Sequence, residues 1–534
     1  MKRFKAVGIA WVNMKIERTK NASRNILFGI ILKIYQIAVP FLMRTAMIYF
    51  MGVQYLGLNS LFTSVLQVLN LAELGVGSAM VYSMYKPIAE DDTKKICALM
   101  KLYRLYYRVI GFVIGGVGLV LTPFVPKLIS GDVPSGLNIY ILYLMNLAAT
   151  VLSYWLFAYK NSLLQAHQRV DVVSKITLVT NTFQYAIQIL ILVLSHNYYY
   201  YYVLAILATQ IITNISTAIV VDKMYPRYNP EGNLDKDEIQ QINHKIRDLF
   251  TSKIGFVVVD SADTIVISAF LGLTALAIYQ NYFYILSSVM GFIAVVFTSC
   301  TAGIGNSIIV ETAEKNYNDL KKFTFLISWI SGMCLCCFLN LYQPFMELWV
   351  GKDLMLSMGA VVCFCVYFYI QEINKLFNTY KDASGIWHED RFRPLVVALT
   401  NLCLNLLMVN FWGIYGILLS TVFATLFVGM PWLLHNLFTT VFDKKYLSGF
   451  LINLGRYVAG VALVGVITYL ICNRISFSNL WLTLVIRGLI SCLIPNAVFW
   501  GLYHRLREFK ECVKLVDKMT KRKFRLSGLI LGEK

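Results

Sequence analysis

The sequence predicts an all-α polytopic membrane protein with about fourteen transmembrane helices, and three observations lead to this fold class. Of the 534 residues, 58% are hydrophobic and 14% are charged, whereas a soluble domain carries about 25% charged residues. The mean hydropathy is +0.62. The apolar residues also gather in runs of about 20, which is the length that crosses a bilayer as a helix.

The predicted spans follow one another along most of the chain with short connections. They lie at 25–50, 59–84, 104–124, 137–159, 172–195, 198–221, 249–271, 274–299, 323–347, 355–377, 393–411, 414–436, 449–472 and 478–502.

The basic residues predict the orientation of these spans. The net charge is +19, and if the N-terminus is cytoplasmic, the basic residues of the outside loops are Lys127, Lys352 and Arg474. Because Lys and Arg concentrate in cytoplasmic loops, both termini are expected in the cytoplasm. The cytoplasmic loops and termini therefore account for the net positive charge, and no nucleic acid is expected as a partner. The eleven cysteines fall mainly in apolar runs and suit packing, so neither disulfides, a metal nor a cofactor is expected.

The chain is expected to divide into bundles separated by polar segments. These are a basic cytoplasmic leader (1–24), an N-terminal six-helix bundle (25–221), a cytoplasmic linker (222–248), a C-terminal six-helix bundle (249–440), two additional transmembrane helices (441–503) and a basic cytoplasmic tail (504–534). In the tail, Leu506, Phe509, Val513 and Val516 recur at helical spacing. This pattern is typical either of an amphipathic helix on an anionic membrane surface or of a solvated basic tail.

The two bundles show an internal repeat. A shift of 220 residues places Lys33 over Lys253 and Gly52 over Gly272. A second match places the pair Gly75/Gly77 over Gly303/Gly305. A six-span unit that repeats in the same orientation implies two halves related by an axis normal to the membrane, with a central cavity between them.

The first predicted span carries two cations inside its apolar run. Lys33, Gln36, Pro40 and Arg44 fall within about 80° on one helix face, and Lys33 and Arg44 are about 16 Å apart along the axis. Each cation costs roughly 2.5–3.5 kcal/mol at the bilayer centre. Such a stripe is expected to face the protein interior or a water-filled cavity, and Pro40 to break the helix. The alternatives are a structural ion pair or snorkelling to the interface.

A cationic cavity favours an anionic substrate, such as a phosphate or pyrophosphate headgroup. The predicted seventh span adds Lys253, Asp260 and Asp263, and the second adds Glu73. These acids suit either ion pairs with the cations or the binding of a coupling proton or sodium ion. In the loop near 390, the side chains of the pair His388 and Glu389, next to Asp390, are expected to be solvated.

Four stretches resemble the bacterial polysaccharide flippases of the multidrug/oligosaccharidyl-lipid/polysaccharide exporter superfamily. They are FMGVQYLGLNSLF (50–62) with LAELGVGSAMVYSMYKPIA (71–89), YKDASGIWHEDRFRPL (380–395), and NLCLNLLMVNFWGIYGILLST (401–421). The resemblance runs from about residue 20 to 505. It implies two six-helix bundles plus two helices, alternating access, and a multi-pass protein of the bacterial cytoplasmic membrane.

The resemblance also implies a substrate of oligosaccharide joined to undecaprenyl pyrophosphate, moved from the inner to the outer leaflet. By position, Lys33 and Arg44 match the cations that engage the pyrophosphate, and Gln36 and Lys253 join them as predicted substrate-binding residues. Asp260, Asp263 and Glu73 are the predicted ion-coupling residues. Membrane lipids are expected partners, and a polysaccharide polymerase and assembly proteins are candidate ones.

Three other functions remain open. One is an ion-coupled multidrug exporter of the same fold, which the cationic stripe disfavours. Another is an integral membrane glycan-assembly enzyme, which the short outside loops and the lack of a recognisable catalytic motif disfavour. The third is a scaffold without transport activity. The sequence has no GxxxxGK[ST] loop for a nucleotide, so the flippase hypothesis needs an ion gradient or the membrane potential to give direction.

Overall fold

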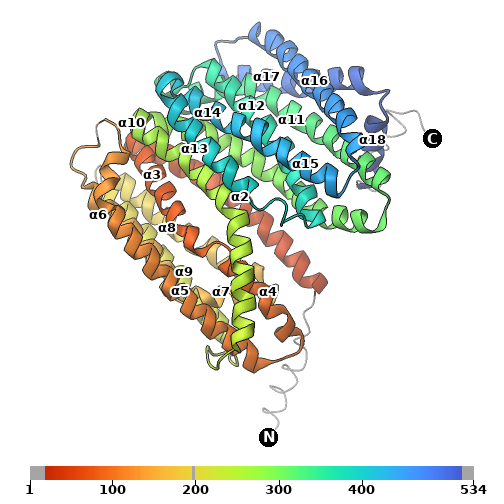
Figure 1. Ribbon diagram of the computed structural model, residues 1–534. Helices are drawn as coiled ribbons and strands as arrows, with labels where there is room; N and C mark the ends of the chain where they lie inside the picture. The colour runs from red at the N-terminus through yellow and green to blue at the C-terminus, as the bar shows by residue number, and fades with distance from the viewer. Residues whose placement is uncertain (1–17, 132, 195–198, 520–534) are drawn as a thin grey trace, which may run out of the picture. The chain divides into compact units, whose positions relative to one another are not determined.

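The computed structural model describes residues 18–131, 133–194 and 199–519, and this part of the chain is helical and contains no β-strand (Figure 1). It forms two compact units, Met1–Leu273 and Thr274–Lys534. The helices of the first unit are α2 (Arg18–Phe50), α3 (Val53–Leu69), η1 (Asn70–Glu73), α4 (Val76–Ala89), α5 (Thr93–Leu121), η2 (Thr122–Leu128), α6 (Ile139–Trp155), α7 (Tyr159–Ala166), α8 (Val170–Leu194) and α9 (Tyr199–Met224).

Helix α10 (Lys236–Val310) continues from the first unit into the second. The helices that follow are α11 (Ala313–Val350), η3 (Lys352–Leu354), α12 (Met358–Ser384), α13 (Arg393–Trp412), α14 (Ile414–Phe423), the π-helical η4 (Ala424–Gly429), α15 (Met430–Thr440), η5 (Lys444–Tyr446), α16 (Leu447–Asn473), α17 (Leu480–Tyr503) and α18 (Arg507–Met519).

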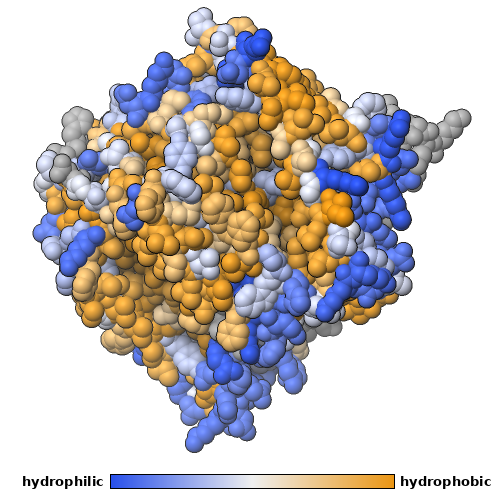
Figure 2. Space-filling model, turned by 45° about the horizontal axis from the view of Figure 1, so that its top comes forward, coloured by the Kyte–Doolittle hydropathy of each residue, from blue (hydrophilic) through white to orange (hydrophobic). Residues whose placement is uncertain are grey.

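The described residues contain 12 helical stretches that are long and apolar enough to cross a membrane, or 13 if the pair α6 and α7, bent by 54°, is one span. Large apolar side chains lie exposed along these stretches, and Figure 2 shows them covering much of the face in view. The chain is therefore a multi-pass membrane protein. The fourteen predicted spans become 13 because the seventh and eighth both lie in α10, whose backbone is non-helical at Gly272 (φ 88°, ψ 174°). The count of 12 also leaves out the fourth predicted span, which falls on the bent pair α6 and α7.

Two glycines that the internal repeat superposes have the same uncommon backbone. Gly52 has φ 104° and ψ 163°, close to the values at Gly272. This region is essentially restricted to glycine, so both interruptions of the helical backbone depend on that residue. The second match behaves differently. Gly75 has φ 88° at the break before α4, whereas Gly303 and Gly305 lie within helix α10.

The first part of α10 runs antiparallel to α3, η1 and α4, and three contacts show this. At Gly57, an added Cβ would lie 2.2 Å from the carbonyl oxygen of Leu273. The Gln67 amide donates a hydrogen bond to Asp260 over 3.2 Å. At Gly75, an added Cβ would lie 2.8 Å from the carbonyl oxygen of Ile246. Small residues allow this close approach of backbones. Residues 249–273 therefore belong to the first unit, and not to the C-terminal bundle that was predicted to begin at 249.

The predicted linker, 222–248, is helical at both of its ends. Helix α9 continues to Met224 and α10 begins at Lys236. Between them, Tyr225 and Tyr228 are buried and pack on His167, with ring centroids 4.4 Å and 5.8 Å away. Aromatic burial, rather than an aliphatic core, attaches this segment to the first unit.

Helix α2 passes through Pro40 without a break, contrary to the prediction. Proline removes one backbone donor and disturbs the bond to the carbonyl four residues earlier, but the flanking turns stay helical. Packing against α8 accompanies this continuity, and the hydroxyls of Tyr35 and Thr182 lie 2.9 Å apart.

In the second unit, α11 packs against α12, α16, α17 and α18. Asn340 donates a hydrogen bond to Ser491 of α17 over 3.2 Å, and Trp329 donates one to Asn496 over 2.9 Å. The tail helix α18 places its apolar face on the protein, because Phe509 is fully buried and stacks on Trp329 at 5.5 Å. This face is therefore not available to a membrane surface. Of the predicted stripe, the Val516 side chain lies outside the described residues.

Candidate functional site

The predicted cations of the first span are both half-buried on α2. Lys33 lies between the exposed Ile31 and Ile34, and within the described residues it makes neither an ion pair nor a hydrogen bond. Arg44 lies close enough to the buried Tyr202 of α9 to interact with it electrostatically. Gln36 is exposed. The Lys253 side chain lies outside the described residues, so its predicted role stays a prediction.

Glu73 occupies a break in the second predicted span. The α-helical turns stop at Leu69, η1 follows over Asn70–Glu73, and α4 resumes at Val76. The Glu73 carboxylate accepts hydrogen bonds of 2.7 Å from the hydroxyls of Tyr107 on α5 and Tyr154 on α6. Because two phenols solvate the charge, a carboxylate is tolerated beside broken helix ends within apolar surroundings.

The predicted acids of α10 lie one turn apart. Asp260 is half-buried and accepts the hydrogen bond from Gln67, while Asp263 is buried. Asp260 and Lys33 do not pair, since the described contact of Asp260 is to a neutral amide. A carboxylate with one amide donor retains lone pairs for a cation or a proton. The arrangement is therefore compatible with ion binding.

Glu372, a buried acid of a membrane-spanning helix, was not predicted. Glu372 on α12 has no exposed surface, neither of its carboxylate oxygens has a hydrogen-bond partner, and Lys375 lies 3.7 Å away. The signal was present in the sequence, because an acid inside the apolar run 355–377 is rare and usually functional.

The loop near 390 contains the two side chains that were predicted to be solvated and, beside them, a buried ion pair. His388 and Glu389 are exposed, as predicted. Asp390 is only 2% exposed and accepts hydrogen bonds of 2.6 and 2.7 Å from Arg393. Asn436 of α15 donates to the same carboxylate over 3.3 Å. A bidentate, fully bonded pair can be buried where isolated charges cannot, which explains the burial of Asp390.

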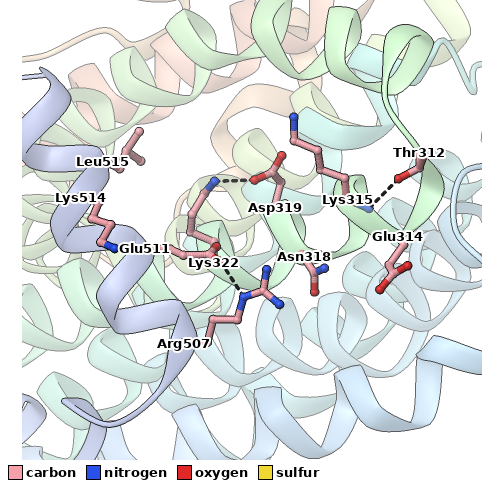
Figure 3. A pocket seen from close by; sticks show the side chains of 10 residues that line it. All are labelled: Thr312, Glu314, Lys315, Asn318, Asp319, Lys322, Arg507, Glu511, Lys514 and Leu515. Atoms are coloured by element: carbon pink, nitrogen blue, oxygen red, sulfur yellow. Dashed lines mark hydrogen bonds and ion pairs between the residues drawn. The ribbon is translucent and has the colours of Figure 1, made fainter.

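A polar pocket of about 520 Å³ lies between the start of α11 and α18 (Figure 3). Its charged lining consists of Lys315, Lys322, Arg507, Lys514, Glu314, Asp319 and Glu511. Lys322 pairs with Asp319, and Arg507 pairs with Glu511 at 2.7 Å. The hydroxyl of Thr312 caps α11 by accepting a hydrogen bond from the Lys315 backbone. Because cations and acids nearly balance and pair locally, this pocket has little excess charge to offer a ligand.

Comparison with known proteins identifies the fold. The chain is similar to the lipid II flippase MurJ in its inward closed conformation, with a TM-score of 0.68 and 15% sequence identity over 90% of this chain and 99% of that one. It is also similar to an inward-facing multidrug resistance MATE transporter of the MOP superfamily, with a TM-score of 0.57 and 11% identity over 77% and 95% of the chains.

A third similarity is to the Vibrio cholerae MATE transporter VcmN, with a TM-score of 0.51 and 15% identity over 78% and 96% of the chains. No protein-family model and no curated protein sequence matches the chain. The chain has the fold shared by the MurJ lipid II flippase and the MATE transporters of the MOP superfamily.

Proposed function

We propose that this protein is a flippase that moves polyprenyl-pyrophosphate-linked oligosaccharides from the inner to the outer leaflet of a bacterial cytoplasmic membrane, for cell-surface polysaccharide assembly. The observation that carries the proposal is the cation pair of α2. Lys33 and Arg44 are half-buried in a membrane-spanning helix, and Lys33 has no charged partner among the described residues. Such a cation in a low-dielectric environment is costly unless it serves a ligand, and a pyrophosphate supplies the missing negative charge.

In the proposed mechanism, the headgroup and its sugars enter a cavity that is open to the cytoplasm. Lys33 and Arg44 neutralise the pyrophosphate, and Gln36 contributes hydrogen bonds to its oxygens or to the first sugar. Alternating access then exposes the site to the other side without any bond being made or broken. The substrate drives this change only through different affinities for the two states.

Net movement of the lipid in one direction requires an energy source, and an ion gradient can supply it. We assign ion coupling to Glu73, Asp260 and Asp263, because Glu73 lies at a helix break and the Asp260 carboxylate has a single described donor, Gln67. Protonation or sodium binding at these acids changes the local charge by one unit. That change is large enough to bias two conformations that differ by a few kcal/mol.

The test is transbilayer movement of a fluorescent undecaprenyl-pyrophosphate oligosaccharide in proteoliposomes. Wild type is compared with Lys33→Ala and Arg44→Ala, and with Lys86→Ala as the control. Lys86 is a matched control because it is an exposed lysine in an i,i+4 pair with Glu90. We expect each α2 variant to lose at least about 90% of the flipping rate, because one lost charge-assisted contact of roughly 1.5–3 kcal/mol corresponds to a factor of ten or more.

Three results would contradict parts of the proposal. Equal flipping by Lys33→Ala, Arg44→Ala and Lys86→Ala would remove the pyrophosphate site from α2. Flipping that ignores both pH and sodium gradients, with Glu73→Gln and Asp260→Asn as active as wild type, would remove the ion-coupling assignment. Failure of folded wild-type protein to move several glycan lipids would reject the flippase itself.

The second candidate function is a multidrug exporter, because MATE transporters share the fold. A cationic drug would be repelled by Lys33 and Arg44. Drug efflux from everted vesicles that persists or rises in Lys33→Ala would favour this candidate, whereas the flippase proposal expects no drug movement in either protein.

A further inference from the structure

A pocket in the first unit has a lining whose positive charge is not balanced by acids. It has a volume of about 470 Å³ and lies between α5 and the segment that leads into α10. Its lining includes three cations, Lys101, Arg104 and Arg108, and no acidic residue. The α11–α18 pocket of Figure 3 differs from it, because there the acids nearly equal the cations in number.

The three cations of this pocket form no ion pair with an acid in the part of the chain that the structure describes. Within the described residues, neither Arg104 nor Arg108 makes an ion pair or a side-chain hydrogen bond. Lys101 donates a hydrogen bond to the neutral amide oxygen of Asn233 over 2.9 Å. Three guanidinium or ammonium groups that share one concave site therefore retain donors for an anion.

The wall opposite α5 is held in place. Lys95 pairs with Glu238 at the start of α10, and the Tyr106 hydroxyl donates a hydrogen bond of 2.6 Å to Asn243. The Cys97 thiol contacts the Arg227 carbonyl oxygen at 3.7 Å. These contacts lie on both sides of Lys101 and Asn233 along the chain, so the pocket is part of the folded unit and not a gap beside a loose loop.

The next turns of α5 are apolar and exposed. Lys101, Arg104, Arg108 and Phe112 follow one another at helical spacing on one face. Leu105 lines the pocket and is 55% exposed, and Val109 and Phe112 are 51% and 67% exposed. A cationic pocket that continues into an exposed apolar helix face matches a lipid, whose phosphate and acyl chains are joined in the same order. A soluble anion would make no use of the apolar face.

We infer that the pocket formed by Lys101, Arg104 and Arg108 of α5 with Pro230, Gly232, Asn233, Leu234 and Ile239 binds the phosphate headgroup of an anionic membrane phospholipid, with its acyl chains along Leu105, Val109 and Phe112. The arginines provide planar donors that match phosphate oxygens. This site is separate from the proposed substrate residues on α2. It holds a resident lipid and takes no part in the transport step.

The test measures the tightest lipid-binding event of the delipidated full-length protein by native mass spectrometry. The probes are phosphatidylglycerol, phosphatidylcholine with the same acyl chains, and inorganic pyrophosphate as a soluble anion. The variant is Arg104→Gln/Arg108→Gln. The matched control is Lys315→Gln/Arg507→Gln, which also removes two cations from a pocket. Each of these cations is already paired with an acid, Lys315 with Glu311 and Arg507 with Glu511. Leu105→Trp is a further variant that fills the pocket without changing its charge.

We expect the double-arginine variant to bind phosphatidylglycerol roughly 30-fold more weakly than wild type, because each cation near a membrane surface contributes a factor of about five. The control should change less than about twofold, and Leu105→Trp should also weaken binding. The inference is overturned if phosphatidylglycerol binds the double-arginine and Leu105→Trp variants as tightly as wild type, or if phosphatidylcholine binds as well as phosphatidylglycerol. It is likewise overturned if pyrophosphate alone shows the arginine dependence.

Discussion

Tyr154 donates a hydrogen bond to Glu73 over 2.7 Å, and this contact joins helix α6 to the break in the second membrane-spanning segment. Tyr107 of α5 donates to the other carboxylate oxygen and lies 2.9 Å from the Tyr103 hydroxyl. The break is thus held by side chains from two further helices. A chain of polar groups of this kind stabilises its members together more than the pairs do separately.

The first prediction concerns this hydrogen bond. Tyr154→Phe should lower the free energy of unfolding by about 1–3 kcal/mol, because a charged acceptor loses a donor in apolar surroundings. Tyr140→Phe on the same helix is the control, since Tyr140 is 46% exposed and should unfold like wild type. The measurement is thermal unfolding in detergent. If Glu73→Gln/Tyr154→Phe loses the sum of the two single effects, the two residues do not interact.

The second prediction concerns the glycine after the break. Gly75→Ala combines a positive φ of 88° with a Cβ that would lie 2.8 Å from the Ile246 carbonyl oxygen. We expect a loss of roughly 1–3 kcal/mol of stability, and often less folded protein. Gly116→Ala is the control, because its Cβ would meet nothing within 4 Å and alanine favours the helix by up to about 1 kcal/mol. Equal melting temperatures for the two variants would disprove the close approach of Gly75 and α10.

The third prediction concerns the buried ion pair of the loop near 390. Asp390→Asn leaves Arg393, which is 6% exposed, without its anion, and should cost about 3–5 kcal/mol. Asp443→Asn removes the partner of Lys445 from an exposed pair and should cost at most about 1 kcal/mol. Chemical unfolding of both variants measures the contrast. A small effect of Asp390→Asn would mean that water reaches Arg393.

The fourth prediction concerns the packing of α18 on α11. The Cys512 thiol is 1% exposed and donates a hydrogen bond to the Lys322 carbonyl oxygen over 3.5 Å. Burial raises the pKa of Cys512 from its ordinary value of 9.0 to about 12. In a background without the other cysteines, we expect Cys512 to resist maleimide at pH 7–8, because the thiolate reacts. A cysteine at the exposed position 510 (Lys510→Cys, with Cys512 replaced) should react fully. Fast labelling of Cys512 would show that α18 leaves α11.

The same shift has a consequence for stability. Because the folded pKa of Cys512 lies above the unfolded value, its contribution to stability is fully present below pH 9 and is lost as the pH rises from about 9 toward 12. Cys512→Ala should therefore show a smaller decrease in stability over this range than wild type. An identical decrease in both proteins would show that the Cys512 thiol is not buried in the folded protein.

Much of the architecture could be predicted from the sequence, because a segment that crosses a bilayer must consist mainly of apolar residues. Runs of apolar residues predict spans wherever backbone hydrogen bonds must close within a helix, and the predicted spans 25–50, 172–195 and 478–502 lie close to α2, α8 and α17. Gly52 and Gly272 could be paired from the sequence for a similar reason, because a backbone conformation that only glycine adopts readily requires glycine at both positions. The same logic identified Lys33 and Arg44 as unusual cations.

The tertiary structure decided which polar groups meet, because that depends on residues far apart in the chain. Nothing local to Glu73 indicates that tyrosines 34 and 81 residues away would solvate it, and nothing local to Asp390 indicates the contact with Asn436. The same holds for α18, whose apolar stripe is equally suited to a membrane or to protein until Trp329 is placed beside Phe509. The sequence by itself determined which segments lie in the membrane, which lie in water, and which residues bear charge. The long-range packing decided whether each charge is paired, exposed or left available to a ligand, since the energy of a buried charge is determined by its neighbours in space.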